Sequence, residues 1–149
     1  MKIVKKLKGV ISWHFYNDDE INLVMETVLN LAEGNADATV PVLTNLFKGS
    51  DGDEVTNLYL ITSQDENRLY IDNEQKKLIL NIRFEDLTKV ITVMQGFLKD
   101  KKTPTADMLQ IFIAKKEYML VGFNQQYKRW LKPKKNKNPE NKPENKDNQ

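Results

Sequence analysis

The chain has 149 residues, of which 40% are hydrophobic and 30% are charged, a composition typical of one globular domain with a hydrophobic core. It contains no cysteine, which excludes disulfides, thiolate nucleophiles and cysteine-ligated zinc. The formal net charge is +2, but eight Lys or Arg and three Asp or Glu give residues 128–149 a charge of +5 and leave residues 1–127 with −3. We therefore expect a single, mildly acidic α+β domain over residues 1–127 and a flexible, basic Lys/Asn/Pro-rich tail over residues 128–149.

Membrane-spanning and secretory segments are not expected. No stretch reaches the roughly 20 apolar residues that a membrane helix needs. Lys5, Lys6 and Lys8 interrupt the apolar run near the N-terminus, and no uninterrupted signal-peptide core follows it. The sequence therefore predicts a cytoplasmic protein with no membrane partner.

The first predicted element is a strand. Side chains alternate between apolar and polar over residues 3–16, which indicates one long amphipathic strand with Gly9 as a bulge or bend. Leu7 and Trp13 fall on the side predicted to face the core. His14 falls on the other side and is expected to be half exposed.

A helix follows over residues 18–33. Asn17 and Glu20 have the spacing of a capping box, apolar residues recur at helical spacing, and Gly34 follows as the stop signal. Residues 41–49 predict a second, short helix with Pro41 in its first turn. The alternative is an extended conformation for Thr39–Leu43.

The rest of the chain predicts strands and one more helix, joined by short polar links. Short links between consecutive strands favour an antiparallel meander followed by a hairpin. The predicted elements are strands 54–62, 68–72 and 76–84, a helix within residues 85–100, and strands 108–114 and 117–123.

This element order predicts an α+β fold with a curved antiparallel sheet of five or six strands and two main helices. From residue 54 on, the order β-β-β-α-β-β is that of the OB-fold, a partly open barrel that binds single strands and oligosaccharides. The analogy concerns element order alone. No internal repeat is visible in the sequence before the tail.

Patterns that would indicate catalysis are missing. His14 is the only histidine, and its place in a strand favours a structural role over a triad or a metal site. Carboxylates are numerous but none is marked as a catalytic pair, and the Asp51–Glu54 segment lacks the later ligands of a calcium loop. No glycine-rich phosphate loop occurs. We therefore expect no enzyme activity, no cofactor and no metal.

Aromatic residues that stand beside lysines in the sequence indicate a binding function, as opposed to a catalytic one. Single-stranded nucleic acid is held by aromatic rings that stack on bases and by a positive track along the phosphates. Because lysines far outnumber arginines, we expect attraction to the backbone with weak sequence selectivity, for DNA or for RNA. The predicted contacts are Lys5, Lys6, Lys8, Lys115 and Lys116 on the body, Tyr59, Tyr70 and Trp130 for stacking, and Lys128, Arg129, Lys132, Lys134 and Lys135 on the tail.

The alternative prediction is a protein-interaction module, such as an inhibitor, an immunity-type protein or an assembly factor. Such a module would dock a protein partner through the acidic body or through a sheet edge. The sequence leaves the choice between the two functions open, as it does the identity of any partner and the oligomeric state.

Overall fold

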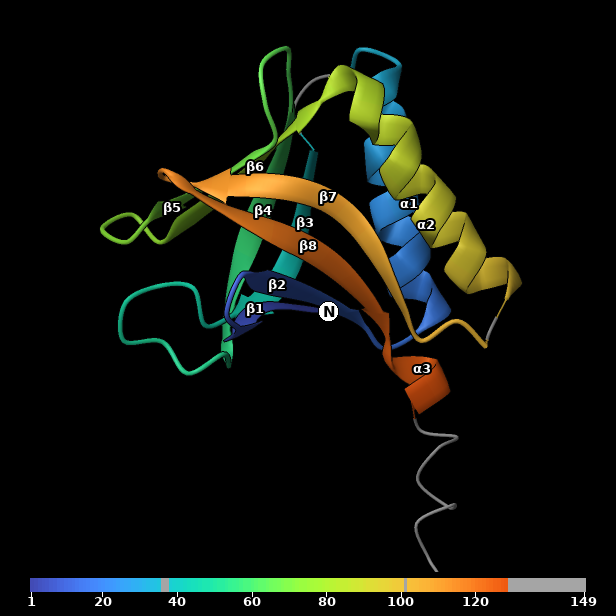
Figure 1. Cartoon of the computed structure of the whole chain (residues 1–149), viewed down its shortest axis with the longest axis horizontal. Coiled ribbons are helices and arrows are strands. Elements are labelled where there is room, and N and C mark those ends of the chain that lie inside the picture. Colours follow the sequence, from blue (N-terminus) through green and yellow to red (C-terminus); the bar gives the residue numbers. More distant parts are fainter. Residues whose placement is uncertain (36–37, 101, 129–149) are drawn as a thin grey trace, which may run out of the picture.

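The structure is a computed structural model that describes residues 1–35, 38–100 and 102–128. The described part contains eight strands, three α-helices and one short 3-10 turn (Figure 1). In chain order the elements are β1 (Lys2–Leu7), β2 (Val10–Phe15), α1 (Asp18–Ala32), β3 (Ala38–Thr44), β4 (Glu54–Ser63), β5 (Arg68–Asp72), β6 (Lys77–Arg83), η1 (Phe84–Asp86), α2 (Leu87–Lys99), β7 (Thr105–Ile113), β8 (Lys116–Asn124) and α3 (Gln125–Lys128).

The eight strands close into one barrel in the order β1-β2-β8-β7-β5-β6-β4-β3. The α+β class is therefore confirmed, as is the element order from residue 54 on, while the prediction of five or six strands is wrong. Every second pairing is parallel, namely β1–β3, β2–β8, β4–β6 and β5–β7, so the sheet is mixed and not antiparallel throughout. The two additional strands come from residues 3–16, which form a hairpin, and from residues 38–44.

The barrel consists of two halves with the same topology, β-β-α-β-β. In each half a short parallel seam joins two hairpins, through β1 and β3 in the first half and through β5 and β7 in the second. The seams match in detail, because Leu43 N donates to Met1 O at 3.1 Å in one and Phe112 N donates to Asn67 O at 2.9 Å in the other. The two halves repeat a topology and a pattern of hydrogen bonds, and not a pattern of residue types. The sequence therefore does not display the repeat.

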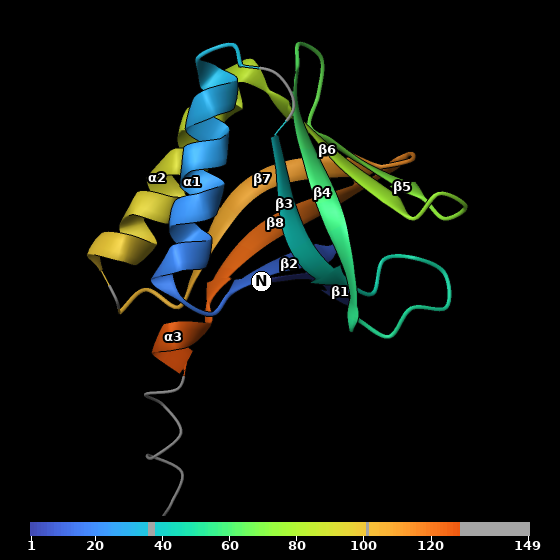
Figure 2. The same ribbon diagram turned by 180° about the vertical axis from the view of Figure 1, so that it is seen from behind.

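The strand directions place the four hairpin turns, residues 8–9, 45–53, 73–76 and 114–115, at one end of the barrel, which we call the turn end. Helices α1 and α2 lie side by side across the opposite end, which we call the helix end, as Figures 1 and 2 show. α3 follows β8 at the helix end. The two ends therefore carry different kinds of surface.

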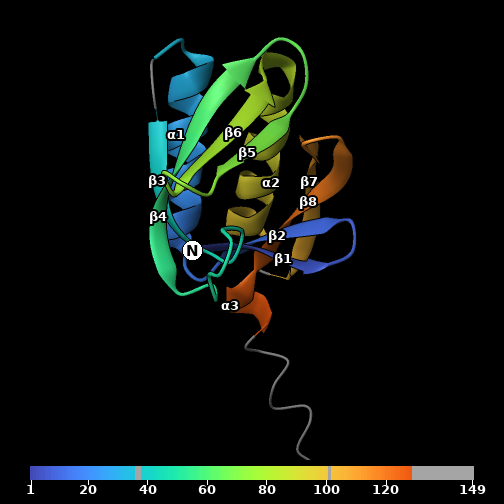
Figure 3. The ribbon, with the colours of Figure 1, turned by 90° about the vertical axis from the view of Figure 1, so that its left-hand side faces the viewer.

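The core fills the space between the helices and the ring of strands, and Figure 3 views this ring with both helices behind it. Both long helices turn an apolar face into the barrel, where each buried aliphatic or aromatic side chain stabilises the fold by about 1.5–3 kcal/mol. None of the described helices is long and apolar enough to cross a membrane. The buried helix residues include Ile21, Val24, Val28 and Leu31 on α1, and Val90, Met94 and Phe97 on α2.

Residues 3–16 form the hairpin β1–β2, and the prediction of one long strand is wrong. Gly9 has a φ of +77°, the left-handed conformation that tight hairpin turns require and that glycine adopts without strain. The predicted faces change accordingly. Leu7 is 66% exposed at the hairpin tip. His14 is buried, because Phe123 stacks on its ring at 4.8 Å and the Gln125 side chain lies 2.8 Å from its Nδ1.

Residues 38–44 form strand β3, so the short helix predicted over residues 41–49 is wrong and the extended alternative is confirmed for this segment. Pro41 is tolerated because its missing N–H costs no ladder bond. Leu43 N donates to Met1 O, and the backbone nitrogen of residue 41, two residues earlier, faces the same side of β3. At the level of residue 41 strand β1 has not yet begun, so no strand is present there to accept a hydrogen bond.

The prediction that the next three strands form an antiparallel meander is also wrong, because these strands pair in a different order. β4 pairs in parallel with β6, and β5 lies on the far side of β6. Strand β6 is thus central to this part of the barrel. Its inner face buries Leu78, Leu80 and Ile82, as the alternation predicts, whereas Phe84 follows the strand in η1 and is exposed.

Candidate nucleic-acid interface

A row of side chains crosses three strands on the outer face of the barrel. Tyr59 of β4 is paired with Ile79 of β6, and Ile79 is paired with Tyr70 of β5. Leu58 and Leu60 are fully buried on the other face, and this alternation turns Tyr59 outward. Because neighbouring strands lie about 4.8 Å apart, the Cα atoms of the two tyrosines are roughly 10 Å apart. Tyr70 is 48% exposed, and Tyr59 is partly buried.

Lys77, two residues before Ile79 on β6, provides a positive charge beside this row. Its Nζ lies 4.9 Å from the centre of the Tyr59 ring, within the range of a cation–π contact. Lys77 also lines two shallow grooves, of about 460 and 340 Å³, one containing Tyr70 and the other Tyr59. We call Tyr59, Tyr70, Lys77 and Ile79 the tyrosine face.

Acidic side chains near the tyrosine face are partly engaged in the β5–β6 turn. Asp72 and Glu74 line the groove that contains Tyr70. Asp72 Oδ1 accepts hydrogen bonds from Glu74 N at 3.1 Å and from Gln75 N at 3.0 Å, so this carboxylate holds the turn in shape. Asp72 is also the strand partner of Lys77. The face is therefore mixed in charge, with its lysine next to a tyrosine ring.

Lysines gather over aromatic rings at the turn end. Lys5 Nζ lies 5.3 Å from the centre of the buried Tyr118 ring and 3.3 Å from its hydroxyl oxygen. Lys116 Nζ lies 5.5 Å from the same ring. Lys76 Nζ lies 5.4 Å from the ring of Phe47, which is also buried. The barrel is thus plugged by aromatic rings at this end and covered by ammonium groups.

The five body lysines predicted as contacts are all exposed and all belong to the turn end. They meet there because β2 and β8 pair in parallel, with Val10 beside Met119. Arg68 links this cluster to the tyrosine face, because its guanidinium donates to Ala114 O and so holds the β7–β8 turn next to β5. The structure brings together Lys5, Lys6, Lys8, Lys115 and Lys116.

The described chain ends far from this lysine cluster along strand β8. Strand β8 runs from Lys116 at the turn end to Asn124 at the helix end, a span of about 26 Å at 3.3 Å per residue. α3 then ends at Lys128, on the helix end. The Lys128 side chain and the residues Arg129, Trp130, Lys132, Lys134 and Lys135 lie outside the described residues.

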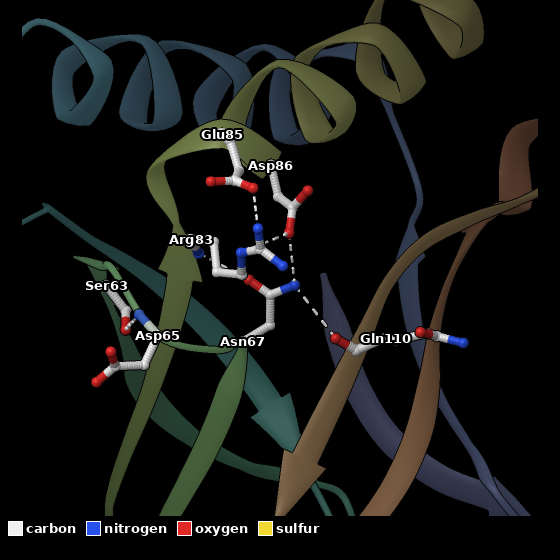
Figure 4. Close-up of polar contacts among 7 residues, drawn as sticks. All are labelled: Ser63, Asp65, Asn67, Arg83, Glu85, Asp86 and Gln110. Atoms are coloured by element: carbon white, nitrogen blue, oxygen red, sulfur yellow. Dashed lines mark hydrogen bonds and ion pairs between the residues drawn. The ribbon is translucent and has the colours of Figure 1, made fainter.

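A second polar cluster lies at the seam between β5 and β7 (Figure 4). The buried side chain of Asn67 donates from Nδ2 to Asp86 Oδ2 at 2.9 Å and to Gln110 O at 3.2 Å, and its Oδ1 accepts from Arg83 N at 2.7 Å. Arg83 forms an ion pair with Glu85. A hollow of about 360 Å³ opens beside this cluster. The cluster closes the seam between β5 and β7.

Within the described residues, His14 and the Asp51–Glu54 segment have structural contacts. His14 lies in the closed environment described above. Within residues 1–35, 38–100 and 102–128, no group of three histidine or carboxylate side chains could hold a metal ion. Asp51 and Asp53 are exposed, and Asp51 Oδ1 accepts from Asp53 N at 3.0 Å in a local turn. The absence of enzyme activity and of a cofactor stays a prediction.

Several residues of the candidate interface were missed at the level of sequence. The sequence predicts Lys76 and Lys77 only as the start of the strand over residues 76–84. Ile79 carries the available signal, because it is an apolar residue on the side of this strand that also bears Lys77, which indicates a partly covered outer face. Tyr118 gave no signal, since its contact with Lys5 joins residues that are 113 positions apart.

Comparison of the chain with protein-family models, with curated proteins and with solved structures finds no match.

Proposed function

We propose that the protein binds single-stranded nucleic acid without catalysing a reaction, as an accessory or regulatory protein. The observation that carries this proposal is the row in which Tyr59 and Tyr70 flank Ile79 on the outer face, with Lys77 beside the Tyr59 ring. Two outward-facing aromatic side chains, separated by strand β6, can each accept a base. OB-folds hold single strands by stacking rings and a positive groove, and here the rings lie on the tyrosine face while the lysines gather at the turn end.

Tyrosines and lysines would contribute to binding in different ways, because their side chains differ in chemistry. Tyrosine rings stack on any base, which gives affinity without sequence preference. The phosphates would follow the lysines of the turn end, which reach the tyrosine face through the Arg68 contact with Ala114. Lysine attracts phosphate as a point charge and lacks the planar fork that reads guanine. Binding is accordingly expected to weaken with salt through counterion release.

Replacement of Tyr70 by alanine is the direct test. We expect the variant to bind a fluorescein-labelled oligothymidylate about tenfold more weakly than the parent chain, because one stacked base contributes ~1–3 kcal/mol. Fluorescence anisotropy of the full-length chain at about 50 mM salt measures the dissociation constant, since electrostatic binding is strongest at low salt. The same titration with oligouridylate compares DNA with RNA.

Tyr16→Ala is the matched control. Tyr16 is 42% exposed, close to the value for Tyr70, but it lies at the helix end just before α1. We expect its removal to leave the dissociation constant unchanged. Failure of the parent chain to bind at this salt concentration, or equal losses in the two variants, would overturn the proposal.

The alternative function is docking of a protein partner through the acidic body or through a sheet edge, and the route through a sheet edge has less support. Every described strand has a neighbour on both sides in the closed barrel, so docking by addition of a strand would require a seam to open.

A further inference from the structure

Helix α1 presents an acidic stripe to solvent. Its exposed positions recur at spacings of four, three, four and three residues, which places them on one face of a helix. The exposed Leu29 lies beside this face. Residues 17–35 contain five acidic residues and no Lys or Arg, whereas α2 contains no acidic residue. The stripe consists of Asp19, Leu23, Glu26, Asn30 and Glu33.

The basic tail begins beside the first turn of this helix. Gln126 Nε2 in α3 donates to Asp18 Oδ1 at 2.8 Å, and Gln125 contacts His14 on β2. These contacts fix the point at which the chain leaves the barrel. The residues that follow therefore start within reach of the N-terminal end of the stripe.

The tail matches the stripe in charge, in apolar content and in length. Residues 128–135 contain five cations and no acid, and they include Trp130 and Leu131. α1 has 15 residues and is about 22 Å long at 1.5 Å per residue. Eight extended residues reach up to roughly 26–29 Å, which is enough to follow the whole helix.

We propose that residues 128–135 bind the acidic stripe of α1 in the same chain. The cations pair with Asp19, Glu26 and Glu33, and the apolar side chains of the tail pack on Leu23 and Leu29. Tethering at α3 raises the local concentration of the tail, so individually weak surface ion pairs add up to a stable contact. This interaction does not depend on nucleic-acid binding, and it would withhold the tail cations from any other polyanion.

Disulfide formation between two introduced cysteines tests this contact. The parent chain contains no cysteine, so no competing disulfide can form. Asn35→Cys at the far end of α1 is combined with Asn136→Cys in the tail. The matched pair replaces Asn35→Cys by Thr88→Cys, which is exposed in the first turn of α2 at the same end of the helix pair (Figure 2). We expect the α1 pair to close at least about fivefold faster at low salt, because docking raises the effective concentration of its thiols.

The charge-reversed background Glu26→Lys/Glu33→Lys completes the experiment. Both side chains are exposed, so the fold should be kept, which circular dichroism checks. We expect the advantage of the α1 pair to disappear in this background and at high salt. Equal rates for the two pairs in the parent background, or an advantage that survives charge reversal, would overturn the proposal. The stripe would then be left open to a cationic protein partner.

Discussion

Truncation of Phe97 to alanine is expected to lower the free energy of unfolding by about 3–5 kcal/mol, the usual cost of emptying a fully buried aromatic site. Phe97 lies on α2 with no exposed surface. Its ring centre is 6.3 Å from that of Phe15 on β2, and its ring edge lies beside Gly122 on β8. One side chain thus holds the helix layer to two strands. Urea unfolding, followed by the fluorescence of the buried Trp13, measures the change.

Gln95→Ala on the exposed face of the same helix is the control, and we expect it to change the free energy of unfolding by less than about 0.5 kcal/mol. A loss below about 1 kcal/mol for Phe97→Ala would contradict the packing described here, because truncation of a buried aromatic costs far more than a surface substitution.

The contact between Phe97 and strand β8 can also be tested by a substitution at Gly122 of β8. A Cβ added at Gly122 would lie 3.0 Å from Met108 Sδ and 3.1 Å from Phe97 Cε2. Gly122→Ala alone is therefore expected to cost about 1–3 kcal/mol through overpacking. In the Phe97→Ala background the added methyl group enters vacated space, so its cost should fall. This non-additivity is the mark of direct contact.

Replacement of Asn67 by alanine is the second large effect, an expected loss of about 2–4 kcal/mol of unfolding free energy. The substitution removes three side-chain hydrogen bonds of a buried residue, one of them to the carboxylate of Asp86. Hydrogen bonds to charged groups contribute about 1.5–3 kcal/mol, and buried partners left unsatisfied add to the loss. Because these bonds close the seam between β5 and β7, hydrogen exchange should also rise in both strands.

Asn45→Ala provides the comparison. Asn45 also makes two hydrogen bonds, accepting from Lys5 N at 3.0 Å and donating to Lys5 O at 3.3 Å, but at the solvent-exposed turn end. Water can replace these bonds, so we expect a loss of less than about 1 kcal/mol. Similar losses in the two variants would mean that Asn67 does not hold the seam.

The helices and most later strands could be predicted because their patterns are local. Asn17 Oδ1 accepts from Glu20 N at 3.0 Å, as the capping box predicts, although the Glu20 carboxylate accepts from Tyr16 N at 2.8 Å and not from Asn17 N. The errors arose where long-range pairing decided the outcome. The place of Pro41 in a strand depends on where β1 begins.

Closure of the barrel depended on the same kind of long-range contact. Met1 donates its ammonium group to Glu20 Oε2 at 2.5 Å, just as Asn67 binds Asp86 in the other half. In both seams the residue before a strand thus contacts an acid that follows in the chain, Glu20 in α1 and Asp86 in η1. A single sequence does not reveal either contact, because each joins two residues that are 19 positions apart and that only the fold brings together.

The candidate interface was predicted in its residue types but not in its geometry. The sequence predicted Tyr59 and Tyr70 as stacking residues on strands, and left open whether their rings face the core. Their alignment in one row depends on the parallel pairing of β4 with β6, which the expected meander did not contain. The separation of the body lysines from the start of the tail follows from the length of β8, and it too required the fold.

A titration of the isotope-labelled, full-length chain with oligothymidylate, followed by two-dimensional NMR, tests the central claim most directly. If bases stack on the tyrosine face, the amide signals of Tyr59, Tyr70 and Lys77 should move most, together with those of the β7–β8 turn. Unchanged spectra at low salt, or changes confined to α1 and the helix end, would contradict the assignment of this face to nucleic acid.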